Sequence, residues 1–234
     1  MINYAHRGAS ERAPENTMAA FFLGLEMGAN GIETDVQRTR DGRLVLFHDN
    51  VLTRIVPEES GAIADYDYAE LMKFDFGSHK HPRYQGERIV LLEDFLRYFS
   101  GKPIALAIEL KYPGMGKDVL ELIERYGAAE QTVITSFKWD ALTEVRELNR
   151  EIRLGFLTRD GEGFMERMKE YRIMQLCPKA VDVTEELVKR WHEAGFNVRA
   201  WGVTDRRLMA KCVLCDVDGM TVNFPDALVE LLKA

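Results

Sequence analysis

The sequence has few cysteines, no long apolar run and no basic excess, and each absence excludes a class of protein. Three cysteines among 234 residues cannot form the disulfide framework of a small secreted domain. Cys212 and Cys215 form a single C-x-x-C pair, so we expect packed, reduced thiols rather than a zinc or redox site. No run of about 18 uncharged apolar residues occurs, and Met1–Gly8 lacks the pattern of a secretory signal. We therefore expect a soluble, cytoplasmic protein without stable membrane insertion.

The chain is acidic, with 31 Lys and Arg against 38 Asp and Glu and a formal net charge of −7. Nucleic-acid binding depends on clustered Lys and Arg, and no basic run is present, so we expect no nucleic-acid partner. With 46% hydrophobic residues the chain can bury a full core, and we expect one domain over residues 1–234. The sequence carries no indication of an oligomeric state.

Short apolar segments alternate with amphipathic segments along the chain, which predicts a parallel sheet with helices outside it. If the hairpin 31–48 contributes one barrel strand and one appended arm, the strands number eight, which favours an α/β fold, the (β/α)8 TIM barrel. A doubly wound open sheet is the alternative, but no G-x-G-x-x-G follows the first strand. The expected strands are 2–6, 31–39, 44–48, 104–110, 132–135, 153–157, 173–176, 197–203 and 219–222, and the expected helices include 16–28, 117–126, 138–148, 162–171 and 184–194.

One segment, about residues 50–88, interrupts this alternation directly after the second barrel strand and its hairpin. It is polar, contains Pro57 and Pro82, and has only a short helical pattern near Tyr68–Phe74. We interpret it as a small insertion rather than a separate domain.

The hairpin itself places candidate site residues. Asp-Gly is a strong signal for a two-residue loop, and with Asp41-Gly42 as that loop Asp35 falls opposite His48. Directly opposed residues project to one face of a sheet, and Glu33 shares that face by strand alternation. We therefore expect Glu33, Asp35 and His48 to line one side of a single cavity.

Three carboxylates, Glu33, Asp35 and Glu109, lie near the C-terminal ends of predicted strands, where barrel enzymes hold their active sites. Oxygen ligands without cysteine suit a hard divalent cation, Mg²⁺ or Ca²⁺. A buried ion-pair network with Lys111 is the alternative interpretation of the same residues.

Two histidines, His6 and His48, are expected at the same mouth, where one can accept a proton and the other donate one near neutral pH. Arg7 suits bidentate contact with phosphate, and Lys111 supplies a point charge. A divalent cation, two cationic side chains and an acid/base pair together are suited to phosphodiester hydrolysis.

These residues belong to a larger set of motifs that spans positions 6 to 225: His6–Gly8, Pro14–Thr17, Glu33–Val36, Thr39-x-Asp41-Gly42, Val45–Asp49, Glu109–Lys111, Thr135–Phe137, Val217–Gly219 and Asn223–Pro225. Through this set the sequence resembles the bacterial glycerophosphodiester phosphodiesterases of the cytoplasmic type. That family is related in fold to phosphatidylinositol-specific phospholipase C.

The resemblance implies metal-dependent hydrolysis of a small glycerophosphodiester to sn-glycerol 3-phosphate and an alcohol such as choline or ethanolamine. It assigns roles that agree with the residue-based reasoning above. His6 and His48 take the acid/base positions, without an assignment of which is which. The implied metal ligands are Glu33, Asp35 and Glu109, the implied phosphate-binding residues are Arg7 and Lys111, and the implied aromatic wall of the glycerol pocket is Trp201.

The sequence departs from the usual family pattern in two places near the rim of the expected site. Leu52-Thr53-Arg54 is followed by Ile55–Glu59 instead of a glycine-containing turn, and Trp201–Thr204 reads Trp-Gly-Val-Thr. These departures concern the leaving group, so a lysophospholipase D-type reaction on larger phosphodiesters is an alternative, favoured if residues 50–88 present an apolar rim. A barrel that binds phosphodiesters without turnover is the other alternative.

Overall fold

Each strand of the main sheet pairs in parallel with the next, and the sheet closes on itself. The computed structural model describes residues 1–159 and 161–233. Closure follows from the first strand, which pairs in parallel with both the second and the last. The predicted (β/α)8 barrel is confirmed. Its strands are β1 (Ile2–His6), β2 (Gly31–Arg38), β4 (Ala105–Leu110), β5 (Thr132–Ser136), β6 (Arg153–Thr158), β7 (Gln175–Pro178), β8 (Asn197–Val203) and β9 (Gly219–Val222).

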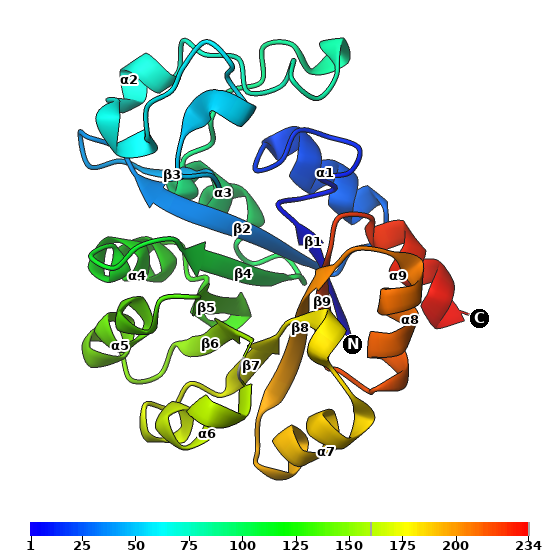
Figure 1. Cartoon of the computed structure of the whole chain (residues 1–234). Coiled ribbons are helices and arrows are strands. Elements are labelled where there is room, and N and C mark those ends of the chain that lie inside the picture. The colour runs from blue at the N-terminus through cyan, green and yellow to red at the C-terminus, as the bar shows by residue number, and fades with distance from the viewer. Residues whose placement is uncertain (160, 234) are drawn as a thin grey trace.

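Helices surround this barrel on the outside (Figure 1). Where periodicity predicted a helix, one is present with its ends shifted by one or two residues. Three further helices, at Leu92–Phe99, Arg206–Leu214 and Pro225–Lys233, were not among those predicted. None of the described helices is both long and apolar enough to cross a bilayer. The helices are α1 (Met18–Glu26), α3 (Leu92–Phe99), α4 (Gly116–Arg125), α5 (Trp139–Leu148), α6 (Gly161–Glu170), α7 (Glu185–Glu193), α8 (Arg206–Leu214) and α9 (Pro225–Lys233).

The largest apolar core lies between the strands and these helices. Alternate residues of β2, such as Ile32 and Val36, point outward into it, and the rings of Phe21 on α1 and Phe95 on α3 meet edge to face at 5.0 Å. This shell is the source of most hydrophobic stabilisation, because it removes the most apolar surface from water.

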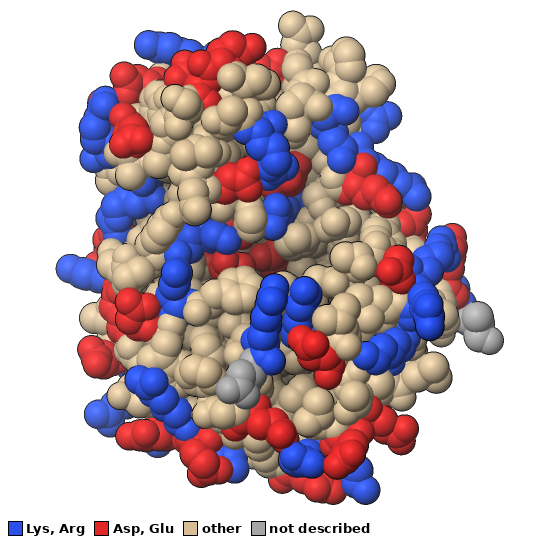
Figure 2. Space-filling view, in the orientation of Figure 1, with Lys and Arg blue, Asp and Glu red and all other residues tan. Residues whose placement is uncertain are grey.

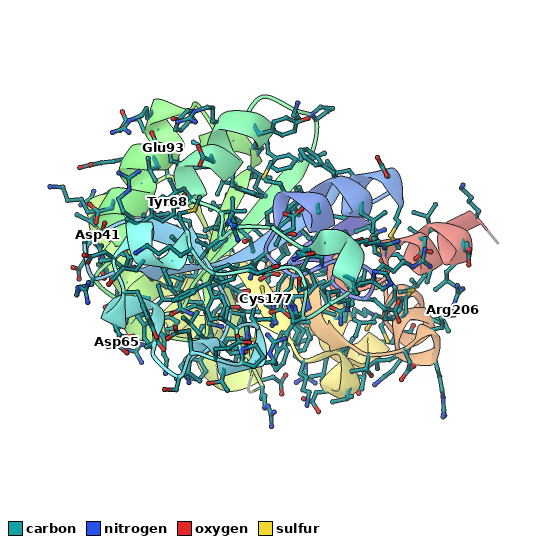
Figure 3. The ribbon with its side chains drawn as sticks, turned by 90° about the horizontal axis from the view of Figure 1, so that it is seen from above. Asp41, Asp65, Tyr68, Glu93, Cys177 and Arg206 are labelled. Atoms are coloured by element: carbon teal, nitrogen blue, oxygen red, sulfur yellow. The ribbon has the colours of Figure 1, made fainter. Side chains whose placement is uncertain are left out.

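The barrel interior is more polar than this shell. Cys177 lies near the middle of the molecule (Figure 3) and is fully buried, as is Arg199. The Arg199 guanidinium stacks 5.0 Å from the Tyr4 ring centroid and lies near Cys177 Sγ. All three cysteines of the chain are free and buried, as expected for packed thiols.

The hairpin departs from the predicted register. β3 (Leu44–Leu46) pairs antiparallel with β2, with Val36 opposite Leu46, so that three residues, Arg40-Asp41-Gly42, form the loop. The prediction that placed Asp35 opposite His48 is therefore wrong by one residue, and the backbone N–H of Phe47 donates to the carbonyl of Asp35 instead.

The cause of the longer loop is local side-chain hydrogen bonding. The Thr39 hydroxyl accepts the backbone N–H of Arg43 at 2.8 Å, and the Asp41 carboxylate accepts the N–H of Tyr68 at 3.0 Å. Gly42 has φ +81°, the left-handed conformation of a three-residue hairpin loop with a glycine bulge. Asp41 is thus an anchor for the segment that follows the hairpin.

That segment, residues 50–88, carries four short helical turns: η1 (Leu52–Arg54), η2 (Ile63–Asp65), α2 (Tyr68–Leu71) and η3 (Pro82–Tyr84). It covers one side of the barrel beyond β3, above α1 in the view of Figure 1. Its apolar side chains form a second core with residues of β3 and the chain just after it. Lys80 Nζ donates to the carbonyl of Ser10 at 2.7 Å, so the segment is also tied to the loop after β1.

The packing of α3 makes a stability prediction. Leu96 on α3 is completely buried in the outer core, and we expect Leu96→Ala to lower the free energy of unfolding by about 2–5 kcal/mol through lost burial and the cavity it leaves. Leu214 at the end of α8 is 81% exposed, so Leu214→Ala should stay within about 0.5 kcal/mol. Urea denaturation of both variants measures the difference, and equal losses would contradict this description of the core.

Candidate active site

The C-terminal ends of two neighbouring strands, β2 and β4, bring three carboxylates together. Strand register sets Asp35 of β2 beside Glu109 of β4, and His6 of β1 beside Glu33 of β2. All three carboxylates are buried, and one oxygen from each lies within 4.8 Å of the others. The face shown in Figure 2 is hollowed near its centre, where acidic atoms are flanked by Lys and Arg atoms.

Two cationic side chains contact this carboxylate cluster, defined as Glu33, Asp35 and Glu109. Lys111 Nζ lies 2.8 Å from Glu109 Oε1 and 3.4 Å from Asp35 Oδ1, and Arg7 Nε lies 3.2 Å from Asp35 Oδ2. Three acids thus face two fixed positive charges, so all three can be ionised only with an excess of negative charge.

The pKa values reflect that imbalance. Burial and repulsion from Asp35 raise the pKa of Glu33 to about 8 and that of Glu109 to about 7. Burial alone would also raise the pKa of Asp35, but Arg7 and Lys111 outweigh it and hold that pKa well below its usual range. The cluster has the oxygen donors that a hard divalent cation requires, and such a cation would offset the repulsion among its ionised carboxylates. Lys111 forms ion pairs with Asp35 and Glu109, as the ion-pair alternative predicted. Glu33 is not among its ion-pair partners, so that alternative accounts for only two of the three acids.

His6 is held by a residue that the sequence reasoning quoted without assigning a role. Its Nδ1 lies 2.6 Å from Asn223 Oδ1, which also accepts the hydroxyl of Ser10. With Oδ1 as acceptor, Nδ1 carries the proton, and Nε2 is left free, 3.9 Å from Glu33 Oε2. Burial, reinforced by the charge of Arg7, lowers the pKa of His6 to about 4, so the ring is neutral near pH 7.

A strained turn after β1 aims the next residue into the site. Arg7 has φ +58° and Gly8 has φ +81°, and a side chain at Gly8 would overlap the backbone of Ala20 on α1. The Arg7 N–H donates to the Glu33 carbonyl at 2.8 Å, which holds the turn against β2. Only glycine fits this second position, because it combines a positive φ with no room for Cβ.

His48 reaches the mouth although its predicted register is wrong. β3 ends at Leu46, and the buried Gln37 amide holds the chain beyond it by donating to the carbonyls of Phe47 and Asp49 at 3.0 and 2.8 Å. His48 Nδ1 then lies 2.7 Å from Asp49 Oδ1. His48 is close enough to the cluster for a positive charge on its ring to lower the pKa of both His6 and Asp35.

Asn16, on the motif before α1, is a further residue whose role the sequence reasoning missed. Its backbone has φ +57°, and its amide donates to Asp35 Oδ2 at 3.0 Å while its carbonyl oxygen accepts the Thr34 hydroxyl. Asn tolerates the left-handed conformation better than most residues, and this property was the available signal. Asn16 therefore orients Asp35 from outside the barrel.

Trp201 lies at a bulge in β8. The register of β8 against β9 shifts between Ala200 and Val203, and Gly202 has φ +70°, so the strand bends where the Trp side chain leaves it. The Trp201 ring meets that of Phe137 edge to face at 5.0 Å, and its indole N–H has no hydrogen-bond partner among residues 1–159 and 161–233. Phe137 follows β5 and is partly exposed, so the pair forms an aromatic wall at the C-terminal end of the barrel.

The other three histidines of the chain contribute nothing to the carboxylate cluster. His79 and His81 are exposed on the segment 50–88 and belong to neither group of potential metal ligands in the described chain. His192 lies at the opposite end of the barrel, with Nε2 2.9 Å from the Asp218 carboxylate just before β9.

Comparison with known proteins agrees with this geometry. Residues 6–227 match the profile of the glycerophosphoryl diester phosphodiesterase family. A glycerophosphodiester phosphodiesterase of Caldanaerobacter subterraneus subsp. tengcongensis is 32% identical, with 98% of this chain and 96% of the relative covered. One of Bacillus altitudinis is 33% identical, with 97% and 96% covered.

Solved structures extend the comparison to the fold. An Oleispira antarctica phosphodiesterase, solved in complex with the product sn-glycerol-3-phosphate, superposes with a TM-score of 0.92 at 27% identity, over 100% of this chain and 97% of that one. The chain therefore belongs to the glycerophosphoryl diester phosphodiesterase family and is an enzyme of that class.

Proposed function

We propose that the enzyme hydrolyses glycerophosphodiesters to sn-glycerol 3-phosphate and an alcohol, with one divalent cation, Mg²⁺ or Ca²⁺, at Glu33, Asp35 and Glu109. The observation that carries the proposal is the buried carboxylate cluster, in which three acids share only the two positive charges of Arg7 and Lys111. The superposed Oleispira enzyme, solved with sn-glycerol-3-phosphate, supports the substrate class.

The residues present fit such a cation. Every donor is a carboxylate oxygen, and the raised pKa values of Glu33 and Glu109 express the repulsion that a positive ion would relieve. When bound, the cation would neutralise phosphate charge and stabilise the charge that develops in the transition state. Arg7 and Lys111 add two fixed positive charges beside the same position, and we propose that they orient the phosphate.

We assign the two histidines opposite tasks. His6 has a lowered pKa and a free Nε2, so it serves as the base that takes a proton from the attacking hydroxyl or water. The Nδ1–H of His48 donates a hydrogen bond to the Asp49 carboxylate, which orients the ring and leaves Nε2 to protonate the departing alcohol.

The glycerol and leaving-group sides differ in their surroundings. We propose that Trp201 and Phe137 line the pocket for the glycerol moiety. Residues 50–88 bury most of their large apolar side chains in their own core, and Val51 is the exposed large apolar residue among them. Such a rim does not favour a long acyl chain, so we propose small alcohols as leaving groups. We also propose that residues 1–234 work as one domain.

The substrate and metal can be tested in one assay. We expect release of sn-glycerol 3-phosphate from glycerophosphocholine, loss of that release with chelator, and recovery with Mg²⁺ or Ca²⁺. An enzymatic glycerol 3-phosphate assay measures it. Full activity in chelator would contradict the metal proposal, and activity only on lysophospholipids would overturn the substrate proposal.

The histidine roles predict a large loss on removal of either ring. We expect His6→Ala and His48→Ala to lower kcat by about 10²–10⁴-fold, the usual contribution of a general acid or base. His192→Ala is the matched control, because His192 has a similarly exposed ring and one carboxylate partner at the far end of the barrel. A variant that retains wild-type kcat removes its residue from the proposed chemistry.

The carboxylate cluster predicts how metal binding depends on pH. The pKa of Glu33 is raised from 4.5 to about 8, so the folded protein holds the proton of this carboxyl more tightly than the unfolded chain does. The resulting contribution to the free energy of unfolding is fully present below pH 4.5 and is lost as the pH rises towards 8. A cation binds the ionised form, so the increase in Tm on adding metal should grow between pH 5 and pH 8. We expect Glu33→Gln to flatten this dependence in thermal-shift measurements. A metal-induced Tm increase that is constant over this range would argue against the cluster as the site.

A further inference from the structure

Arg54, on η1 in the segment 50–88, contacts two carboxylates that belong to different parts of the site. Its Nε lies 2.6 Å from Asp49 Oδ2, and Nη1 and Nη2 lie 2.8 and 2.7 Å from the two oxygens of Glu15. The other oxygen of Asp49 is the one that contacts His48 Nδ1. A single guanidinium thus holds the carboxylate that orients His48.

The contacts continue from Glu15 to the carboxylate cluster. Arg7 Nη1 lies 2.9 Å from Glu15 Oε1, and Arg7 Nε lies 3.2 Å from Asp35 Oδ2. Positive and negative groups alternate along this line, so each group is held between two of opposite charge. Arg54 connects Asp49, which contacts His48, to Glu15, which contacts Arg7 beside the carboxylate cluster.

We propose that Arg54 is a positioning residue for His48, acting through Asp49 to keep the imidazole Nε2 directed at the site. The inference rests on the proposed role of His48 in proton transfer. His48 and Asp49 lie beyond the end of β3, and within the described part of the chain neither pairs with another strand. A carboxylate in such a place is held by side-chain contacts, and a guanidinium with its planar fork fixes direction as well as distance.

The alternative role for the carboxylates around Arg54 is a second metal site. Glu15, His48 and Asp49 offer ligand atoms within 4.8 Å of one another, a group that could hold a metal ion. The Arg54 guanidinium already contacts both carboxylates, so its positive charge stands where a cation would be needed. This favours a fixed cation that orients His48 over a second metal site.

The first test separates kcat from KM. We expect Arg54→Met to lower kcat on glycerophosphocholine by about 10–100-fold, the usual loss when a group that orients an active-site ligand is removed, with KM little changed. Arg54→Lys keeps the charge and should recover part of kcat. A rise in KM with unchanged kcat would overturn the inference, because it would place the effect on substrate binding through Glu15 and Arg7.

Arg40 provides a matched control in the hairpin loop. Its side chain is 51% exposed, against 49% for Arg54, and it also contacts two carboxylates, Asp67 and Glu70. Asp41 and Asp65, which flank this contact, lie at the edge of the molecule in Figure 3, far from the central Cys177. Arg40→Met should leave kcat unchanged, and an equal loss in both variants would indicate a general effect on the segment.

The second test asks whether Arg54 acts through His48. His48→Gln and His48→Gln/Arg54→Met should have the same kcat, since the double variant has no imidazole left to orient. ¹⁵N-histidine spectra, with the His48 signals identified by their absence in His48→Gln, should show a proton on Nδ1 in the wild type and a mixture of tautomers in Arg54→Met. An unchanged tautomer in Arg54→Met would overturn the inference.

The outcomes distinguish this inference from the proposed function. If His48→Gln is as active as the wild type, the catalytic role of His48 fails and the inference fails with it. If His48→Gln is slow while Arg54→Met has normal kcat, only the inference fails. Isothermal titration with Mg²⁺ or Ca²⁺ completes the test: a second ion bound by Arg54→Met but not by the wild type, with normal kcat, would show that Arg54 balances charge without orienting His48.

Discussion

The crowding of three buried carboxylates at adjacent strand ends is the constraint on which the rest of the site depends. Parallel register puts Asp35 next to Glu109, and strand alternation puts Glu33 on the same inner face. Burying like charges together is unfavourable unless opposite charges and hydrogen-bond donors surround them. Arg7, Lys111 and Asn16 supply these charges and donors to Asp35. The pKa of Glu33 stays raised because burial and the neighbouring carboxylates outweigh the opposite charges around it. A cluster of this kind offers the ligand atoms that a divalent cation requires.

The sequence predicted the barrel and the residues of the carboxylate cluster, because both follow from short-range regularities. Alternation along β2 sets Glu33 and Asp35 on one face, and strand–helix alternation sets them at the C-terminal edge. The hairpin register failed because Asp41 and Thr39 use their side chains to bind backbone groups, and a three-residue loop results. The dipeptide Asp-Gly is compatible with both loop lengths, so sequence alone could not separate them.

Residues that orient the site were missed for a different reason. Asn223 contacts His6 across 217 positions of sequence, and Gln37 holds the chain around His48 through two backbone carbonyls. Such hydrogen bonds depend on tertiary placement, and no periodicity or composition reports them. His48 is the clearest case. Its predicted register was wrong, and the Gln37 amide holds the chain on either side of it through the carbonyls of Phe47 and Asp49.

The architecture separates the source of stability from the source of chemistry. The outer core between strands and helices is apolar and continuous, while the barrel mouth holds charges whose burial costs free energy. The segment 50–88 has its own apolar core, and it reaches the charged mouth through a few polar contacts, among them Arg54 and Lys80. A change in the length or composition of this segment can therefore reshape the rim without disturbing the strands that carry Glu33, Asp35 and Glu109. The carboxylate cluster belongs to the barrel, whereas the orientation of His48 depends on a segment added to it.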